Sequence, residues 1–239
     1  MTYTFSPLSD DAVVMQFGAD IHLSTHQKIQ NVATYLQKHP FTGMREYVPA
    51  YTTLTIYYNP VIVYRSLFEF DKKKASPYQL VTDWLTEMME NISESEGSKP
   101  RTIHIPVCYS EAYGPDLQTV AAHNELSTEE VVQLHTANEY LVYMMGFAPG
   151  FPYIGGMNES IATPRKESPR LQIPAGSVGI AGSQTGMYPI ETPGGWQLIG
   201  QTPLQLFRPD KEPPALLQPG DRIRFYAISS TDFKQWKDD

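Results

Sequence analysis

Apolar residues recur with two different periods along the N-terminal part of the chain. Their alternation with polar residues predicts strands within residues 2–18 and over 44–50 and 53–59. Two other segments have helical spacing, and we expect the first helix to use Ser24 as its N-cap and the second to start at Ser76-Pro77. The order strand, strand, helix, strand, strand, helix predicts a small α+β domain whose helices pack on one face of a sheet.

A polar stretch that ends in proline separates this segment from the rest of the chain. Residues 91–100 are rich in Ser, Glu and Gly, as domain linkers are. We therefore predict an N-terminal domain over residues 1–92, a linker over 93–100 and a second domain over 101–239.

The second domain is expected to begin with a strand and two short helices. The strand covers residues 101–109, and the helices start at Gly114-Pro115-Asp116 and at the capping box of Ser127. A strand over 140–147 follows, in which the odd-numbered residues are apolar. Beyond it, short apolar runs separated by Gly and Pro predict a mainly-β domain, with a length that suits a closed or half-closed barrel.

The segment 174–203 is the most unusual in composition. It contains seven glycines, four prolines and a single charged residue, Glu191. This density of Gly and Pro is incompatible with a helix and predicts short strands and tight turns. Two interpretations remain open: backbone exposed at a binding surface, or a tightly wound barrel in which the glycines serve only the corners.

The segment 146–156 also combines glycines and prolines, and it adds aromatic residues. Its two X-Pro bonds and four glycines predict one rigid loop. At least one of Phe147, Phe151 and Tyr153 is expected to be partly exposed, as an anchor for a ligand or partner. The alternative is that these rings plug the barrel.

Composition narrows the class of protein. Apolar residues make up 41% of the chain and charged residues 18%, as in globular proteins, and the net charge of −8 argues against binding to nucleic acid or to anionic membranes. The start of the chain does not resemble a signal peptide, and no apolar stretch of about eighteen residues occurs. A single cysteine, Cys108, excludes an internal disulfide and fits a cytoplasmic protein.

Motifs for common catalytic and cofactor sites are absent from the sequence. There is no phosphate loop, dinucleotide fingerprint, nucleophile elbow or zinc motif, and His22 with His26 is too weak a pattern to predict a metal site. His135, near Glu139, is a candidate general acid–base residue. The alternative is a histidine placed in the last turn of a helix because the helix dipole favours it there.

Three long segments and three short motifs resemble those of a known family. The short motifs are Cys108-Tyr109, Gly114-Pro115-Asp116-Leu117 and His135-Thr136. The segments are Gly146-Phe147-x-Pro149-Gly150-Phe151-x-Tyr153-x-Gly155-Gly156, then the run from Pro174 to Gly186, and Pro193-Gly194-Gly195-Trp196-x-Leu198-Ile199-Gly200-x-Thr202-Pro203. They resemble the family of the 5-oxoprolinase B subunit, which includes the sporulation-kinase inhibitor KipI and is also called allophanate hydrolase subunit 1. The likeness covers essentially the whole chain, and it is strongest over residues 101–226.

The resemblance implies an α+β N-terminal domain and a cyclophilin-like β-barrel. It further implies that the chain works directly with a 5-oxoprolinase C subunit, and also with an A subunit. Together these subunits would convert 5-oxoproline to L-glutamate with hydrolysis of ATP. We do not assign the ATP site to this chain. A KipI-type inhibitor that binds a sensor histidine kinase is the alternative. Gln201 departs from the arginine expected in many relatives, so a contact of that arginine with an anionic group would be lost here.

Site residues are predicted from these segments. The catalytic candidates are His135, Gln184 and Thr185, of which the last two would bind the lactam amide, while glycine turns over 174–186 would offer N–H groups to a phosphate. The residues expected to bind substrate or partner are Phe147, Gly150, Phe151, Tyr153, Gly176, Ser177, Gly179, Gly182, Gly194, Gly195 and Trp196.

Overall fold

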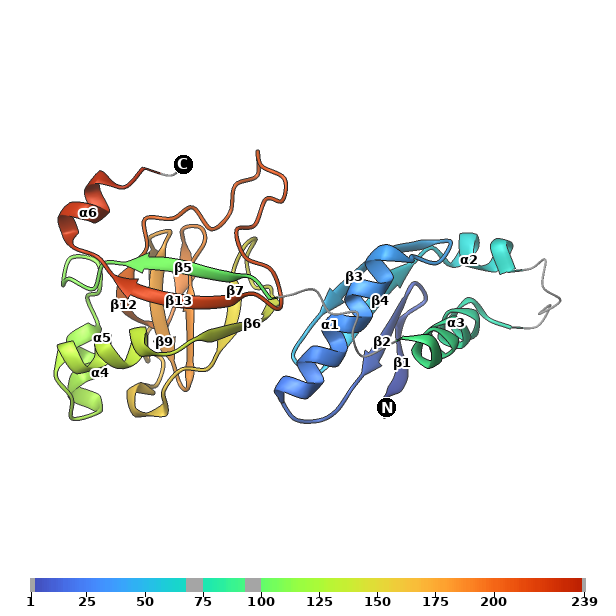
Figure 1. Ribbon diagram of the computed structural model, residues 1–239, viewed down its shortest axis with the longest axis horizontal. Coiled ribbons are helices and arrows are strands. Elements are labelled where there is room, and N and C mark those ends of the chain that lie inside the picture. Colours follow the sequence, from blue (N-terminus) through green and yellow to red (C-terminus); the bar gives the residue numbers. More distant parts are fainter. Residues whose placement is uncertain (1–2, 68–74, 93–99, 238–239) are drawn as a thin grey trace. The chain divides into compact units, whose positions relative to one another are not determined.

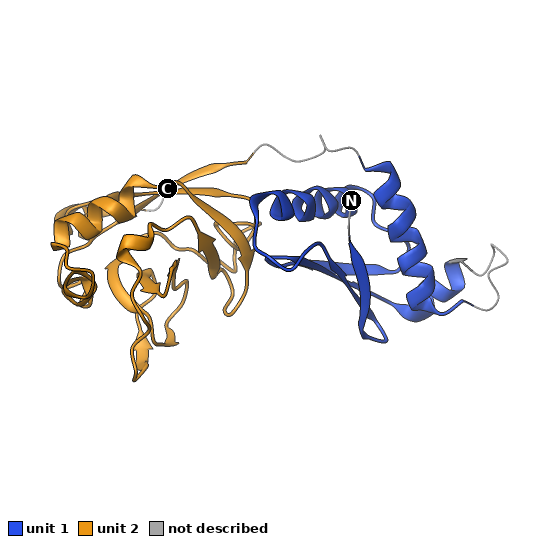
Figure 2. Ribbon diagram, turned by 90° about the horizontal axis from the view of Figure 1, so that it is seen from below, with its two compact units in different colours: residues 1–99 blue, residues 100–239 orange. Residues whose placement is uncertain are grey.

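The computed structural model describes residues 3–67, 75–92 and 100–237 (Figure 1). The chain divides into two compact units, residues 1–99 and 100–239 (Figure 2). The predicted linker 93–100 lies outside the described residues except for Pro100, and it stays a prediction.

The first unit is a four-stranded antiparallel sheet in the order β1-β2-β4-β3. Its strands are β1 (Thr4–Ser9), β2 (Ala12–Gln16), β3 (Met44–Pro49) and β4 (Thr53–Tyr58). The apolar residues of β2 and β4 share one face, because Val13 pairs with Ile56 and Met15 with Leu54, and all four are fully buried. The predicted alternation is confirmed in both strands.

Helices α1 (Leu23–Lys38) and α3 (Pro77–Asn91) cover that face, as Figure 2 shows. Ser76 caps α3 as predicted, since its hydroxyl accepts a hydrogen bond from Gln79 N at 3.2 Å. The prediction for the start of α1 is wrong: His22 is the N-cap, its side chain makes no capping bond, and Ser24 lies inside the helix.

A third helix, α2 (Pro60–Leu67), has no counterpart among the predicted elements. The sequence signal for this helix is limited to Asn59 and Pro60 at its start. In the structure Asn59 Oδ1 accepts hydrogen bonds from the amides of Val61 and Ile62, both at 3.1 Å, and Pro60 occupies the first turn.

The second unit is built on a seven-stranded sheet in the order β12-β9-β10-β7-β6-β13-β5. The strands are β5 (Thr102–Val107), β6 (Tyr140–Met145), β7 (Pro152–Gly155), β9 (Ser177–Ala181), β10 (Gln184–Met187), β12 (Gln197–Gln201) and β13 (Arg222–Ala227). Among these strands, only β13 and β5 run parallel. The main chains of Cys108 and Gln201 join the two ends of the sheet with hydrogen bonds of 2.9 and 3.0 Å, so the sheet forms a nearly closed barrel.

Helices α4 (Leu117–His123) and α5 (Thr128–Ala137) pack against the barrel, and their residues join its core. The capping box of Ser127 with Glu130 is confirmed. A two-stranded sheet of β8 (Arg170–Ile173) and β11 (Thr192–Gly194), a short 3-10 helix η2 (Glu159–Ile161) and a helix α6 (Ser230–Gln235) complete the unit.

Two strand predictions need correction. In the first half of β6 the even-numbered Tyr140 and Val142 enter the barrel core, and because the register shifts between Val142 and Met144, the odd-numbered Met145 packs against the core at the end of the strand. The segment 146–156 is not one loop, because its last part forms β7 and pairs with β6 and β10.

The glycine-rich segment contributes inner strands of the barrel. All five residues of β9 are buried, and β9 pairs with β10 on one side and β12 on the other. Val178 and Ile180 point into the core, whereas Gly179 is paired with Gly186 on the outer face. The exposed-backbone interpretation is therefore wrong for this strand.

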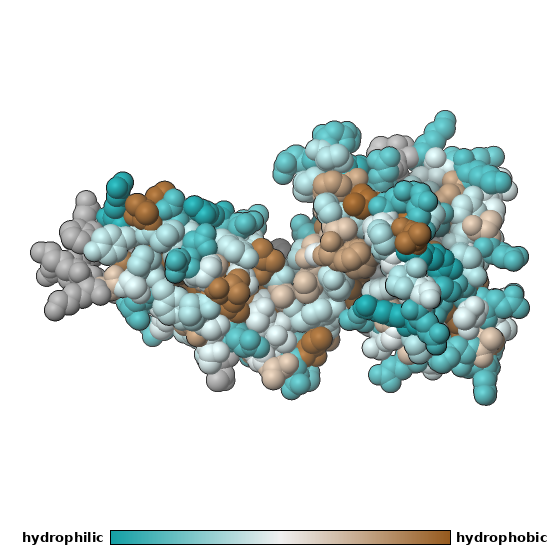
Figure 3. All heavy atoms as spheres, turned by 180° about the vertical axis from the view of Figure 1, so that it is seen from behind, coloured by the Kyte–Doolittle hydropathy of each residue, from teal (hydrophilic) through white to brown (hydrophobic). Residues whose placement is uncertain are grey.

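No helix among the described residues has the length and apolar character that crossing a membrane requires. On the face shown in Figure 3, hydrophobic residues lie in small groups among hydrophilic ones.

Candidate functional site

On the outer face of β9 and β10, Gly179 and Gly186 lie opposite each other and form a flat surface without side chains, which we call the glycine floor. A Cβ on Gly186 would lie 2.9 Å from Cζ3 of Trp196, and a Cβ on Gly179 would lie 3.1 Å from its Cβ. The first contact is shorter than a real Cβ makes and the second is tighter than most, so the two glycines make the space in which the Trp196 side chain lies.

Phe151 is the centre of an aromatic cluster on this floor. It is only 3% exposed, and its ring meets four others edge to face. The centroid distances are 5.2 Å to Phe147, 5.3 Å to Tyr153, 5.6 Å to Tyr188 and 5.9 Å to Trp196. Such edge-to-face contacts add to the stability that burial of the rings supplies.

Tyr188 is buried beside Gly194, where a Cβ would lie 2.5 Å from the Tyr188 hydroxyl. Burial raises the pKa of Tyr188, and a hydrogen bond with the Trp196 backbone and the charges of Arg165 and Arg170 offset part of that rise. The hydroxyl therefore stays protonated at neutral pH.

A pocket of about 250 Å³ opens over this cluster. Five aromatic side chains line it, together with the segment 193–195, and among the described residues Arg165 is the only charged one in the lining. The aromatic residues are Phe147, Phe151, Tyr153, Tyr188 and Trp196. A pocket lined by aromatic rings with one cation suits a small ligand that combines an apolar ring with a negative group.

Phe147 stands at the edge of this aromatic pocket. It is 64% exposed and has a positive φ of 66°. The amide of Ala148 donates to Gly146 O at 2.8 Å, so Phe147 is the central residue of a three-residue turn. A non-glycine residue rarely adopts this backbone conformation, and here it keeps the ring exposed as predicted.

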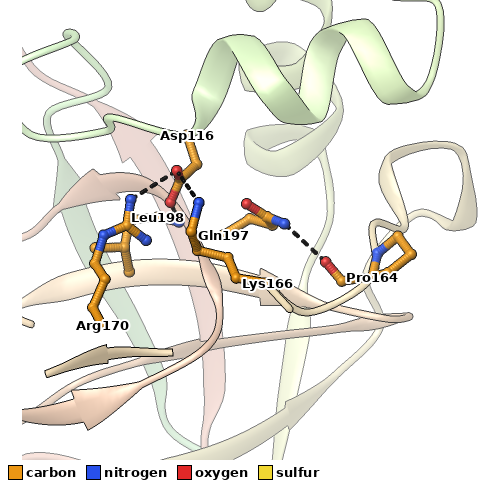
Figure 4. A network of polar contacts seen from close by, with 6 residues as sticks. All are labelled: Asp116, Pro164, Lys166, Arg170, Gln197 and Leu198. Carbon is orange, nitrogen blue, oxygen red and sulfur yellow. Dashed lines mark hydrogen bonds and ion pairs between the residues drawn. The ribbon is translucent and has the colours of Figure 1, made fainter. Parts of the chain in front are cut away.

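A buried carboxylate organises the chain segment that carries Arg165 (Figure 4). Asp116 Oδ1 accepts from Lys166 Nζ at 3.1 Å and from Arg170 Nη2 at 2.8 Å, and Oδ2 accepts from Leu198 N at 2.7 Å. Burial alone would raise the pKa of Asp116, but the hydrogen bonds from Arg170, Leu198 and Lys166 lower it below its usual value. Asp116 is thus an anion that fixes the segment 164–170 to β12.

The structure brings six of the predicted binding residues together at the aromatic pocket: Phe147, Phe151, Tyr153, Gly194, Gly195 and Trp196. Gly179 lies below it, in the glycine floor. Gly176 instead lines a separate, wider hollow of about 700 Å³ that includes Ile190 and Trp236, and Gly150 lies against Leu206 and Phe207.

The predicted phosphate-binding N–H groups are engaged elsewhere. Gly176 N donates to Tyr188 O, Ser177 N to Pro174 O and Gly182 N to Thr163 O, at 2.7, 3.2 and 2.8 Å. Because these three amides complete the fold, they are not available to a phosphate, which argues against the predicted phosphate site, and the roles of the other amides of the segment stay a prediction.

His135 and Thr185 lie inside the barrel, with no exposed surface. His135 Nδ1 is 2.8 Å from the Tyr109 hydroxyl, and its Nε2 is 3.0 Å from Thr185 Oγ1. Burial lowers the pKa of His135 from 6.5 to about 3. This placement argues against the predicted catalytic roles of both residues, since neither reaches solvent or the aromatic pocket. Gln184 is half-buried at the start of β10, and its role stays a prediction.

Arg165, Tyr188 and Asp116 are residues of this region that sequence patterns do not single out as functional. A signal exists for Asp116 at the predicted start of a helix, but its side chain makes no capping bond and turns to the basic residues instead. Arg165 has no signal, because only the tertiary contacts of its neighbours place it at the pocket.

The chain is similar to known proteins along almost its whole length. Residues 3–217 match the family described as carboxyltransferase domain, subdomain C and D. The chain is 48% identical to the 5-oxoprolinase B subunit of Bacillus subtilis (strain 168), with 99% of this chain and 98% of that protein covered. It is 42% identical to the 5-oxoprolinase B subunit of Escherichia coli O157:H7, over 91% of this chain and 93% of that protein.

The fold is similar to that of a solved protein named TTHA0988. The TM-score is 0.76 at 33% identity, and the match covers 92% of this chain. It covers 40% of the other chain, so the solved protein is more than twice as long.

Proposed function

The chain belongs to the carboxyltransferase subdomain C and D family, in the group of the 5-oxoprolinase B subunits, and from this we propose that it is the B subunit of an ATP-dependent 5-oxoprolinase. The observation that carries the proposal is the identity of 48% over nearly the full length of both proteins. The nearly closed barrel supports it, because the family resemblance implies a cyclophilin-like barrel. The single cysteine fits a cytoplasmic location for the complex.

The proposed reaction opens the lactam ring of 5-oxoproline to give L-glutamate, together with the A and C subunits. A lactam carbonyl is a poor electrophile, and transfer of the ATP γ-phosphoryl group to its oxygen makes that oxygen a leaving group. A first water would then add to the carbon, and the C–N bond would break as the nitrogen takes a proton, which leaves an acyl phosphate on the opened chain. A second water would hydrolyse this acyl phosphate to L-glutamate and phosphate. In this scheme the present chain holds the substrate and docks the C subunit, while the other subunits supply the reacting groups.

ATP does not fit the glycine-rich segment or the aromatic pocket of this chain. The amides of the glycine-rich segment are used within the barrel, and the aromatic pocket carries a single cation, whereas three phosphates need several donors. We therefore assign the ATP site to the partner subunits.

The aromatic pocket is the part of this chain that we propose to face the substrate. It combines a rigid apolar wall with an exposed ring at the edge, and its one charge lies on a segment fixed by Asp116. Rigid sites of this kind bind without a large cost of ordering.

The test is reconstitution with purified A and C subunits. The full set should convert 5-oxoproline to glutamate only with ATP present, and omission of this chain should abolish turnover. Full activity of the other two subunits alone would contradict the proposal.

The alternative, inhibition of a sensor histidine kinase, stays a prediction. The same purified chain distinguishes the two functions, since inhibition of kinase autophosphorylation without any effect on 5-oxoproline turnover would favour the alternative.

A further inference from the structure

We infer that Arg165 binds the carboxylate of 5-oxoproline and orients the ring of this small acid against the aromatic wall of the pocket. The inference rests on the proposed function and assigns to it a specificity-determining residue.

Arg165 differs from the other basic residues of its segment in the part of the chain that the structure describes. Lys166 and Arg170 both bind Asp116, at 3.1 and 2.8 Å. Among the described residues, Arg165 has no hydrogen-bond or ion-pair partner, and it is exposed at the pocket. A guanidinium group has five N–H donors arranged in a planar fork, which matches the two oxygens of a carboxylate.

The backbone on both sides of Arg165 is held in place. Gln197 Nε2 donates to Pro164 O at 3.0 Å, as Figure 4 shows, and Lys166 N donates to Gly195 O at 2.8 Å. Both partners lie next to Trp196 in the sequence, so the same segment forms the pocket wall and positions the arginine. Arg165 is therefore presented to the pocket by a fixed segment, as a binding residue requires.

The charges near the pocket favour an anion. The positive charge of Arg165 acts on Tyr188 at the base of the pocket, while Asp116 is neutralised by its own two cations. No acidic residue belongs to the lining that the described residues form. A carboxylate at Arg165 would therefore meet one unpaired positive charge and no negative one.

The dimensions favour a small ring. A volume of about 250 Å³ lies below the range of roughly 300–1,000 Å³ in which drug-sized ligands bind. 5-Oxoproline has one charged group at neutral pH and a compact five-membered ring whose faces are apolar. The single cation would thus select the orientation of the acid, and the rings of Phe147 and Trp196 would hold its methylene groups.

The experiment measures binding of 5-oxoproline by isothermal titration to the full chain, alone and in complex with the C subunit. We expect Arg165→Gln to weaken binding at least tenfold and Arg165→Lys to weaken it less, since lysine keeps the charge but loses the fork. Arg224→Gln is the matched control, because Arg224 is an exposed arginine paired with Glu139, and this variant should bind as the wild type does. 2-Pyrrolidinone, which has the lactam but no carboxylate, should bind weakly and equally to wild type and Arg165→Gln.

Turnover by the reconstituted complex separates this inference from the proposed function. With Arg165→Gln, KM for 5-oxoproline should rise at least tenfold while KM for ATP is unchanged. If the wild-type complex is active and Arg165→Gln leaves both binding and KM unchanged, the inference is overturned and the function stands. If the wild-type complex is inactive yet binds 5-oxoproline through Arg165, the function is overturned and the site stands.

Discussion

His135 donates a hydrogen bond from Nε2 to Thr185 Oγ1 inside the barrel, across 3.0 Å. The direction follows from the rest of the network, because Thr185 donates its own proton to Gly179 O at 3.1 Å and Nδ1 must then accept from the Tyr109 hydroxyl. The ring is neutral, and every polar atom of the network has a partner.

This burial predicts how the stability of the protein depends on pH. The pKa of His135 is about 3 in the folded state and 6.5 when exposed, so between these values the unfolded state binds the extra proton. The free energy of unfolding should therefore fall as the pH drops below 6.5, by about 2 kcal/mol from this residue between pH 7 and pH 5. Urea unfolding at several pH values measures this decrease in the free energy of unfolding.

The control for that prediction is His135→Gln, which cannot titrate. Between pH 7 and pH 5 its unfolding free energy should decrease by about 2 kcal/mol less than that of the wild type. Parallel pH profiles for the two proteins would show that His135 is exposed or charged in the folded state.

Asp116→Asn should cost about 2 kcal/mol of stability, because it leaves Lys166 and Arg170 without their anion. The pKa of Asp116 is lowered, so this contribution is present above the pKa of an unfolded aspartate and is lost as the pH falls through the folded value. Glu139→Gln, at a more exposed pair of ion pairs, should cost less than about 1 kcal/mol. Thermal unfolding at pH 7 compares the two, and equal losses would remove the special role of Asp116.

Two neighbouring glycines should respond differently to the same change. In Gly194→Ala the new methyl group would lie 2.5 Å from the Tyr188 hydroxyl and 2.7 Å from Ile173 Cδ1, both buried, at a cost of about 2 kcal/mol. In Gly195→Ala the nearest atom is 3.7 Å away, so the effect should stay within about 0.5 kcal/mol. Chemical denaturation of both variants checks this, and a tolerated Gly194→Ala would mean that Tyr188 is free to move.

Substitutions of Phe147 and Phe151 by alanine should differ in their effects, one on substrate binding and the other on stability. Phe151→Ala removes the buried centre of the aromatic cluster and should cost about 4 kcal/mol. Phe147→Ala removes an exposed ring, so stability should change by less than about 1 kcal/mol, while KM for 5-oxoproline in the reconstituted complex should rise by about tenfold. An unchanged KM for Phe147→Ala would exclude this ring from the site.

Local signals in the sequence are sufficient for most elements. The caps at Ser76 and Ser127 and the alternation in β2 and β4 each depend on a few neighbouring residues, and each prediction is confirmed. The cap of α1 is mispredicted because Ser24 and His22 differ by less than one turn, and α2 is too short to show a clear period.

The site depends on relationships that are distant in sequence. Gly179 and Gly186 stand out by composition, but only the register between β9 and β10 shows that they face outward beneath Trp196. The aromatic residues of 147–153 and the segment 194–196 are expected from the sequence to bind a ligand, and they do line one pocket. Arg165 could not be predicted, because Gln197 and Gly195 place it from some thirty residues away.

The order of strands in the barrel also determines when this unit can fold during synthesis. β5 pairs along its length with β13, and the register joins Thr102 to Arg222, which follows it by 120 residues. A ribosome therefore releases β5 long before its neighbour exists, and until β13 emerges the growing chain carries an unpaired strand edge of the kind that chaperones protect.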